Sequence, residues 1–487
     1  MAAHACRLVA GCTAGLIALG AHAAAESRGK VEWSRVAQED ITFIHASLAA
    51  SHAGAVDVES SEFARWLERG REQGEELAAR ARDYAGYFFA IQHYTTGFRD
   101  GHVYALTRDD RLPHRWPGFV IALRGERFTV LGRNESLIEC DGRPADLMAR
   151  DVLGTYVGLW SVPGFRPRLA PFLLVDEGNP FVPRPRTCIL QTETGRRQGD
   201  LAWRDIPWDE LNARIAAARG GRRGEIGIRK LGADGYWISL PTFNMSPDVV
   251  HAIRSVSATI EAQRESVRNV AIIVFDVRGN GGGASSLGDD VLRSLIGADY
   301  LAAFTPMPDA IDWRASPANL AYLRDSMVPE LARTYGDASA EVQEYRHIAA
   351  GLASALERGE SYYRVNTQRS PPVPRGSPPV RAKVFLLTDS ACFSACLDFA
   401  DVMRSWPAVI HVGAETRADS VYMEVRSQAL PSGHGSMGIA MKVIRGRMRG
   451  HNQTYVPHHI WQGSMDDTAG LKTWITSLAS GRKRSPP

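Results

Sequence analysis

The sequence places a glycine-rich segment directly after an apolar run, an arrangement that gathers backbone donors at one point. Residues 270–275 are the apolar run, and residues 276–283 read D-V-R-G-N-G-G-G. Consecutive glycines let backbone N–H groups turn toward a common point, because no Cβ obstructs them. Such a point binds an anion, either a phosphate or the oxyanion of acyl transfer. Phosphate is disfavoured, since no Gly-Lys-Ser/Thr follows and the spacing is not G-x-G-x-x-G; the other alternative is a plain tight turn.

Ser394 lies in a second junction of this kind. Residues 384–387 are apolar, and residues 388–400 read T-D-S-A-C-F-S-A-C-L-D-F-A, which predicts a strand followed by a helix. A serine at such an elbow is exposed, and the helix N-terminus behind it stabilises developing negative charge. Taken alone, Ser394 is better explained as a helix cap. Beside a glycine loop that can hold an oxyanion, it is better explained as a nucleophile.

The elements that must position these junctions are those of an α/β protein. From about residue 225 onward, expected strands alternate with helical patterns. The expected strands are residues 236–240, 270–275, 384–387 and 408–412. Continuous apolar runs are typical of strands buried on both faces, so a largely parallel central sheet is predicted. Residues 300–383 are expected to be an insertion, helical at first and then a proline-rich connector.

Two further regions precede this core, which we place at residues 223–480. Residues 26–112 show helical periodicity and predict a helical N-terminal domain. Residues 113–222 show short strands and turns, with a hairpin over residues 119–131, and predict a small β-rich domain. Three domains agree with the length of 487 residues.

The N-terminus has the pattern of a secretory signal over residues 1–25. Arg7 is the positive element, residues 8–20 are the apolar stretch, and small residues follow for cleavage. The sequence therefore predicts an exported, periplasmic protein. The alternatives are a lipoprotein acylated at Cys12 and a buried N-terminal helix. The apolar stretch is too short to span a bilayer, and no later segment is long enough.

Cysteine content fits an oxidising compartment. Cleavage after residue 25 leaves Cys140, Cys188, Cys392 and Cys396, which permit one or two disulfides in three connectivities. The C-x-x-x-C spacing of the last two is wrong for a thioredoxin-type motif, so we interpret them as a structural disulfide or as buried thiols.

The remaining composition excludes several partners. Lys and Arg number 57 against 54 Asp and Glu, a net charge of +3, so neither nucleic acid nor an anionic membrane surface is predicted. His458 and His459 lack metal-ligand spacing, so we predict no metal site. No cofactor is predicted.

Several motifs carry a family resemblance. D-V-R-G-N-G-G-G resembles the D-L-R-x-N-x-G-G loop of the tail-specific, or C-terminal processing, serine peptidases. The S-A-C-L-D run at residues 394–398 resembles their S-A-x-E nucleophile segment, and V-G-A-E-T at residues 412–416 is similar to their V-G-E-x-T strand end. Residues 137–147 resemble the turn of the family's PDZ-like domain. The resemblance implies a crotonase-like α/β peptidase core, a PDZ-like domain at residues 113–222 and a polypeptide substrate.

The resemblance also implies roles for particular residues. Ser394 matches the nucleophile, and the N–H of Ala395 with that of Gly282 or Gly281 would form the oxyanion hole. The family's general base is a lysine in a G-K-G segment, but the aligned residues 417–420 read R-A-D-S. Lys442 is an alternative lysine, although its place in an expected strand favours solvent exposure.

The missing lysine points to a second branch of the family. The tricorn-core and interphotoreceptor retinoid-binding-like proteins carry a D-G-H motif, which Asp100-Gly101-His102 resembles. In that branch a histidine is the base, so His102 is the candidate here; the alternative is that His102 only stabilises a turn with Asp100. The glutamate of that branch has no counterpart in residues 451–458. Glu415 is the candidate acid, with Asp419 as an alternative.

The sequence therefore predicts an exported serine peptidase that cleaves extended or poorly folded polypeptides through an acyl-enzyme. A catalytically inactive periplasmic binding protein on the same scaffold, holding a peptide or an apolar ligand, is the alternative. The lost lysine and glutamate favour that alternative, whereas the retained Gly281–Gly283 loop, Ser394 and His102 argue against it. Acyl transfer or hydrolysis on a non-peptide substrate is a third hypothesis, and no feature of the sequence specifically supports it.

Overall fold

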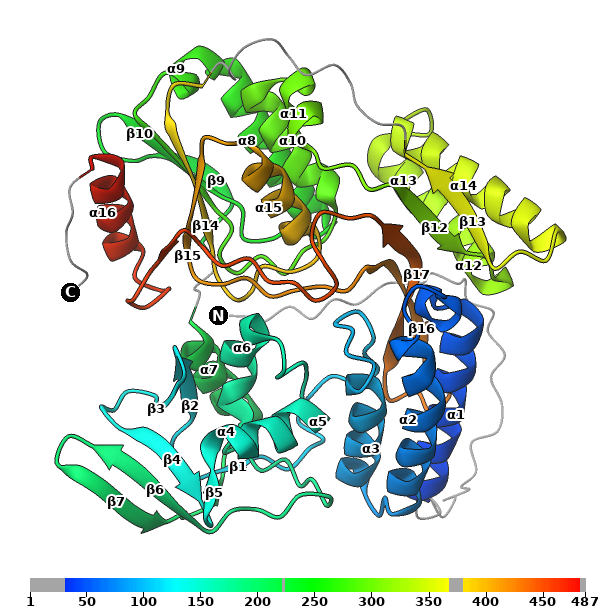
Figure 1. Cartoon of the computed structure of the whole chain (residues 1–487), viewed down its shortest axis with the longest axis vertical. Helices are drawn as coiled ribbons and strands as arrows, with labels where there is room; N and C mark the ends of the chain where they lie inside the picture. Colours follow the sequence, from blue (N-terminus) through cyan, green and yellow to red (C-terminus); the bar gives the residue numbers. More distant parts are fainter. Residues whose placement is uncertain (1–30, 221–223, 368–379, 482–487) are drawn as a thin grey trace, which may run out of the picture. The chain divides into compact units, whose positions relative to one another are not determined.

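The computed structural model describes residues 31–220, 224–367 and 380–481 (Figure 1). The chain divides into two compact units, Met1–Glu32 and Trp33–Pro487, and all the elements below belong to the second. The predicted signal segment and the prolines from 371 to 379 lie outside the described residues. Among the helices of the described ranges, none is long and apolar enough to cross a membrane.

The second unit begins with three helices. They are α1 (Trp33–Ser51), α2 (Glu62–Ala79) and α3 (Tyr84–Thr96). Ile41, Ile44 and Leu48 recur at helical spacing along α1 and are fully buried. The helical periodicity predicted for this segment is confirmed. After α3 the chain turns at residues 97–102, which brings His102 out of the helical region.

The next region is an antiparallel sheet with the strand order β2-β3-β4-β6-β7. Its elements are β1 (Arg115–Trp116), β2 (Ile121–Arg124), β3 (Arg127–Val130), β4 (Ser136–Cys140), β5 (Arg143–Pro144), α4 (Ala145–Met148), α5 (Gly154–Tyr156), α6 (Arg166–Leu169), β6 (Thr187–Thr192), β7 (Gly195–Asp200), β8 (Arg204–Asp205) and α7 (Trp208–Arg219). The predicted hairpin is the β2–β3 pair. Cys140 and Cys188 face each other across β4 and β6 and form a disulfide.

The core is a six-stranded sheet in the order β18-β15-β14-β11-β10-β9. Its strands are β9 (Gly227–Lys230), β10 (Gly235–Ser239), β11 (Ile272–Asp276), β14 (Lys383–Thr388), β15 (Val409–Gly413) and β18 (His459–Ile460). All neighbouring pairs are parallel except β9–β10. The predicted, largely parallel sheet is confirmed, and every residue of β11 is buried as that prediction requires.

Helices cover both faces of the core sheet. They are α8 (Pro247–Ala262), α9 (Arg264–Arg268), α10 (Ser285–Ile296), α15 (Ala395–Ser405) and α16 (Thr468–Ala479). Ile273 and Phe275 of β11 belong to the apolar cluster of α8, α10 and α15, whereas Ile272 and Val274 belong to that of α16. Successive side chains of β11 therefore pack against helices on opposite faces of the sheet, which is why the sequence of this strand is continuously apolar.

A second sheet, with the order β13-β12-β17-β16, was not predicted. Its strands are β12 (Ala310–Arg314), β13 (Tyr362–Asn366), β16 (Tyr422–Ala429) and β17 (Ser436–Arg445), all antiparallel. The predicted insertion therefore contains two strands as well as helices α11 (Ala298–Phe304), α12 (Pro317–Tyr322), α13 (Val328–Tyr335) and α14 (Ala340–Glu357). Strand β12 pairs with β17, which is distant in the sequence, so local pattern did not reveal it.

Candidate active site

The predicted site residues meet at one cavity of about 690 Å³. His102, Gly281, Ser394 and Ala395 all line it, although they come from three distant segments of the sequence. The insertion adds Glu330 and Tyr335 to the wall, and β17 adds Lys442. The parallel sheet explains part of this arrangement, because β11 and β14 are neighbours and their carboxyl ends deliver the glycine loop and Ser394 to the same edge.

Ser394 occupies a backbone conformation that L-residues rarely adopt, with φ 55° and ψ −126°. It lies at the N-cap of α15, but its side chain makes no capping hydrogen bond. Ser394 is therefore not a conventional cap. Non-glycine residues held in such a region cost about 1–3 kcal/mol and occur where the surroundings impose them, often at active sites. A sharp turn from strand to helix of this kind presents a nucleophile above the sheet.

The glycine loop lies directly against the elbow. A Cβ added at Gly282 would come within 2.9 Å of Ser394 Cβ and 3.1 Å of Ala395 N. The Gly282 N–H donates to Asn280 Oδ1 at 2.9 Å, while Asn280 Nδ2 donates to Leu240 O at 2.8 Å. Gly282 is therefore already hydrogen-bonded. Within the described ranges, the N–H groups of Gly281 and Ala395 donate to no protein atom, which leaves these two to face an oxyanion.

Asp389 joins the two loops. Its buried carboxylate accepts hydrogen bonds from Gly279 N at 3.0 Å and from Ala391 N at 2.9 Å. The glycine loop and the segment that leads to Ser394 are thus fixed to a single side chain. Burial raises the pKa of Asp389, and the two backbone donors act in the opposite direction.

We expect a Gly282→Ala substitution to lower the rate of peptide hydrolysis, because the added Cβ would displace the backbone around Ser394. The added Cβ would meet Phe393 O at 2.7 Å and Ser394 Cβ at 2.9 Å, at a φ of 99° that disfavours alanine. The elbow must move to relieve these contacts, and a displacement of about 1 Å at a reacting group costs roughly 10²-fold in rate. Peptide hydrolysis by the purified variant measures this loss.

Gly297→Ala is the matched control for that substitution. Gly297 has a φ of 88°, but a Cβ there would have no neighbour within 4 Å. Both variants carry the backbone cost of alanine at positive φ, about 1–3 kcal/mol, and only Gly282→Ala carries the contact with Ser394. Equal activity of the two variants would show that the glycine loop does not support the elbow.

His102 is buried next to a buried carboxylate. Its ring contacts Phe393, with centroids 4.9 Å apart, and its Nδ1 lies 3.6 Å from Asp100 Oδ1. Asp100 accepts hydrogen bonds from His102 N and from Ser420 Oγ, both at 2.8 Å. His102 Nδ1 is buried and has no hydrogen-bond partner. The Asp100 carboxylate is therefore fixed in place and directed at the imidazole.

A second histidine faces the other side of Asp100. His52 Nε2 lies 3.8 Å from Asp100 Oδ2, and His52 Nδ1 accepts from Gly54 N at 3.0 Å. Burial lowers the pKa of His52 to about 3, so it is neutral, and its proton lies on Nε2 because Nδ1 accepts. Burial also raises the pKa of Asp100. The D-G-H motif placed Asp100 next to His102, but the only role predicted for Asp100 was that of a turn partner.

The structure places two other predicted residues, Glu415 and Asp419, outside the cavity lining. Glu415 does not line the cavity, and its carboxylate accepts from Thr454 Oγ1. The structure therefore does not bring Glu415 to the cavity that Ser394 and His102 line. Asp419 is fully buried and pairs with Arg447 at 2.9 Å. Arg278, at the start of the glycine loop, donates two hydrogen bonds of 2.8 and 2.7 Å to Asp276.

Lys442 corrects an expectation. Its side chain is only 18% exposed and lines the cavity, whereas solvent exposure was expected. The Nζ donates to Glu424 Oε2 at 2.9 Å. Lys442 is therefore paired with a carboxylate in the cavity wall.

Beneath the nucleophile, α15 carries two carboxylates into a buried charge cluster. Asp398 and Asp401 both pair with Arg449, at 3.2 and 3.1 Å, and Asp419 pairs with the same guanidinium at 3.2 Å. Tyr455 Oη donates to Asp401 at 2.5 Å. Burial raises the pKa of Asp401 to about 7, against the attraction of Arg449.

This shift gives stability a pH dependence. Asp401 keeps its proton in the folded chain between about pH 4, the pKa of a free aspartate, and pH 7. The folded state binds more protons there, so the unfolding free energy falls as pH rises, by up to about 1.4 kcal/mol per pH unit. Denaturant titrations from pH 4.5 to 7.5 measure this slope, which Asp401→Asn should flatten. Identical slopes in the two proteins would contradict the shift.

The chain is similar to known proteins in part of its sequence and in its fold. Residues 235–454 match the model of peptidase family S41. The crystal structure of mature CPAF is similar over 93% of this chain and 99% of that chain, with a TM-score of 0.57 and 12% identity. A CPAF s499a mutant is similar over the same shares, with a TM-score of 0.56 and 14% identity. No curated protein sequence matches the chain.

An α/β core, a strained serine at a strand-to-helix elbow and a matching family together define a serine-type peptidase. Residues 235–454 match the model of peptidase family S41, and the glycine loop and the nucleophile segment within this range resemble those of the tail-specific peptidases. The similarity to CPAF extends beyond this segment and shows that the whole described fold has a counterpart.

Proposed function

We propose that this protein is an exported serine peptidase with Ser394 as nucleophile and His102 as general base. The observation that carries the proposal is the shared cavity: Ser394, His102, Gly281 and Ala395 line one hollow although the sequence separates them widely. Export rests on the signal pattern of the sequence, and the peptide substrate rests on the family.

The catalytic steps follow from these positions. A peptide carbonyl in the cavity is attacked by Ser394 Oγ while His102 accepts the hydroxyl proton. The N–H groups of Gly281 and Ala395 stabilise the oxyanion, and the N-terminus of α15 adds its positive end. His102 then returns the proton to the leaving amine. Water hydrolyses the acyl-enzyme by the same transfers in reverse.

We propose that Asp100 acts as the carboxylate partner of His102. The glutamate that the related branch uses in this role has no counterpart in residues 451–458. Its carboxylate faces His102 Nδ1, so it favours the tautomer with a proton on Nδ1 and leaves Nε2 free to accept. Asp100 also stabilises the imidazolium that forms when Ser394 loses its proton. Ser420 and the backbone of His102 hold the carboxylate in position.

No hydrogen bond joins Ser394 and His102 among the described residues. The distances between catalytic partners are often long in the absence of substrate and shorten when substrate binds. We therefore propose that substrate binding brings the two side chains together. The wall that the insertion contributes, including Tyr335 and Glu330, is the part that a bound peptide would contact opposite Ser394.

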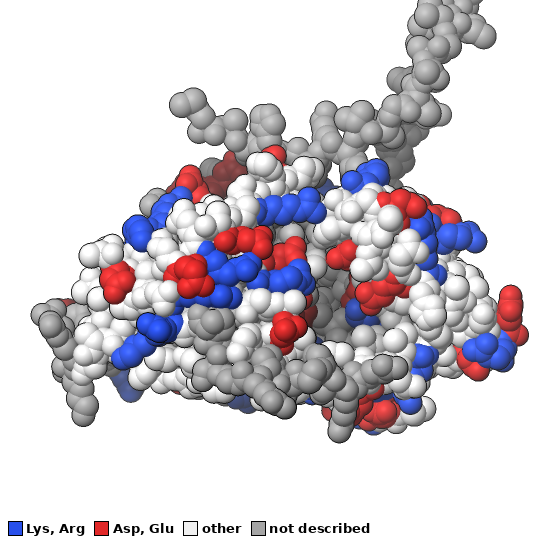
Figure 2. Space-filling model, turned by 90° about the horizontal axis from the view of Figure 1, so that it is seen from above, with Lys and Arg blue, Asp and Glu red and all other residues white. Residues whose placement is uncertain are grey.

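We propose that residues 113–222 are a PDZ-like region that binds polypeptide. The local structure supports this proposal, because β4 ends at the D-G turn of Asp141 and Gly142, and β5 and α4 come after that turn. On the face seen in Figure 2, which is the top of Figure 1 and not the region of residues 113–222, basic and acidic side chains are interspersed, so this face has no field of a single sign to select a charged substrate.

Labelling with a serine-reactive fluorophosphonate tests the proposal. The wild-type protein should be labelled, and Ser394→Ala should not. Equal labelling of both proteins would remove Ser394 as the nucleophile. Labelling of neither would favour the binding-protein alternative. Fractionation of cells that express the full chain tests export, since a periplasmic protein is released with the outer compartment.

A further inference from the structure

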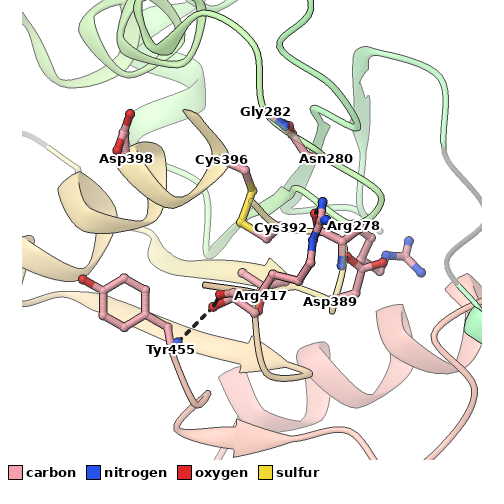
Figure 3. The surroundings of a disulfide bond; sticks show 12 residues. Arg278, Asn280, Gly282, Asp389, Cys392, Cys396, Asp398, Arg417 and Tyr455 are labelled. Atoms are coloured by element: carbon pink, nitrogen blue, oxygen red, sulfur yellow. Dashed lines mark hydrogen bonds between the residues drawn. A yellow bond between two sulfur atoms is a disulfide. The ribbon is translucent and has the colours of Figure 1, made fainter. Parts of the chain in front are cut away.

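The structure brackets Ser394 with a disulfide. Cys392 precedes the serine by two residues, Cys396 follows it by two, and their sulfur atoms are bonded (Figure 3). Both cysteines are fully buried. We propose that this disulfide is a positioning device, which holds the elbow in the one conformation that presents Ser394 to the cavity. The proposal rests on the proposed role of Ser394 as nucleophile.

The two ends of the disulfide lie in different structural settings. Cys392 is fixed to the framework, since its N–H donates to Asp389 O and its carbonyl accepts from Arg417 N, both at 3.1 Å. Cys396 lies in the first turn of α15. Figure 3 shows Asn280 and Gly282 of the glycine loop close to this pair. The disulfide therefore connects the start of a helix to a loop that is anchored independently of it.

The elbow has an obvious way to relax, and the disulfide prevents it. If Ser394 turned from a φ of 55° to an ordinary helical value, α15 would extend toward Cys392 and the side chain would leave the cavity. In a helix, Cβ atoms four residues apart are about 5–6 Å from each other. A disulfide requires them to be about 3.8 Å apart. The bond between Cys392 and Cys396 is thus incompatible with a continuous helix through Ser394.

This bond is poorly placed to stabilise the whole fold. It closes a separation of only four residues, whereas the Cys140–Cys188 bond closes a separation of 48. In the chain-entropy model, a disulfide stabilises more when its loop is longer. Cys140–Cys188 joins two strands of the β-rich region, and neither cysteine lines the cavity. The chain therefore contains its own matched control, and export would supply the oxidising compartment for both bonds.

The test compares two double variants, Cys392→Ala/Cys396→Ala and Cys140→Ala/Cys188→Ala. We expect the first to lose kcat by at least about tenfold with KM within about twofold, since the elbow relaxes while the rest of the cavity remains. Its fluorophosphonate labelling should slow by a similar factor. The second variant should keep kcat and show the larger loss of Tm. Adding a reductant to the second variant should then lower kcat as in the first.

Hydrogen exchange of residues 389–400 provides a readout that does not need activity. We expect faster exchange at the elbow and the first turn of α15 in the Cys392→Ala/Cys396→Ala variant alone. Unchanged kcat in that variant, or an equal loss in both variants, would overturn the proposal. If the wild type neither hydrolyses peptides nor reacts with the probe, the proposed function fails by itself. Exchange that matches the wild type would then overturn the positioning role as well.

Discussion

Ser394→Ala should lower kcat/KM for peptide hydrolysis by roughly 10⁴- to 10⁶-fold, the loss seen when a serine nucleophile is removed from a catalytic set that acts as a unit. The Oγ at the elbow is the atom that would form the acyl-enzyme, and no other group in the cavity replaces it in the proposed mechanism. Fluorophosphonate labelling and hydrolysis of an unfolded polypeptide measure the effect. The alanine keeps the Cβ that contacts Gly282, so Tm should remain close to that of the wild type.

Ser286→Ala is the matched control for this prediction. Ser286 lines the same cavity, and its Oγ lies 3.3 Å from Tyr335 Oη. The Ser286→Ala substitution removes a hydroxyl from the cavity wall and leaves the turn at Ser394 unchanged. Labelling and kcat should therefore change by less than about threefold, as for the loss of a hydrogen bond worth under about 1 kcal/mol. A Ser394→Ala protein that still reacted with the probe at the wild-type rate would refute the assignment of the nucleophile.

His102→Ala should reduce kcat by about 10²- to 10⁴-fold, the usual contribution of a general base. KM should change little, because the imidazole acts on the Ser394 hydroxyl rather than on the bound peptide. Steady-state kinetics with a peptide substrate separate the two parameters. Asp100→Asn should also lower kcat, by a smaller factor, since it disturbs the tautomer of His102 without removing the base.

His114→Ala distinguishes catalysis from the loss of a buried histidine. His114 is also buried, and its Nε2 lies 3.9 Å from Glu177 Oε1, as His102 lies beside Asp100. It does not line the catalytic cavity. The His114 variant should lose stability to a similar degree and retain kcat. If His102→Ala retained kcat instead, the base would have to be sought elsewhere, and Lys442 is the basic side chain of the cavity to replace next.

Local sequence was sufficient for the elements that build the core. The apolar runs of β11 and β14 predict strands buried on both faces, and the glycines and Ser394 follow directly after them. Parallel neighbouring strands end at the same edge of a sheet. The two apolar runs therefore already predict that the glycine loop and the Ser394 segment lie close together. The resemblance to the tail-specific peptidases rested on the same short segments, and residues 235–454 match that family.

Contacts between segments that are distant in the sequence could not be predicted from local patterns. Strand β12 pairs with β17 across more than a hundred residues, so nothing in its own pattern identified the second sheet. The D-G-H motif places Asp100 beside His102, but the hydrogen bond from Ser420 that fixes the Asp100 carboxylate spans 320 residues and is not visible in that motif. Which glycine N–H is available to an oxyanion also depends on a tertiary detail. The Gly282 N–H donates to the Asn280 side chain, so the Gly281 N–H is the one that remains available.

The sequence by itself determined that a serine and a glycine loop stand at the ends of buried strands, because strand burial and turn chemistry are local properties of residue types. Only the tertiary structure decided which groups surround that serine. Ser394 has a positive φ, with Gly282 of a distant segment against its Cβ and the two cysteines of one disulfide on either side. Packing forces such a conformation on a residue that would not adopt it alone, and for that reason sequence pattern does not reveal it.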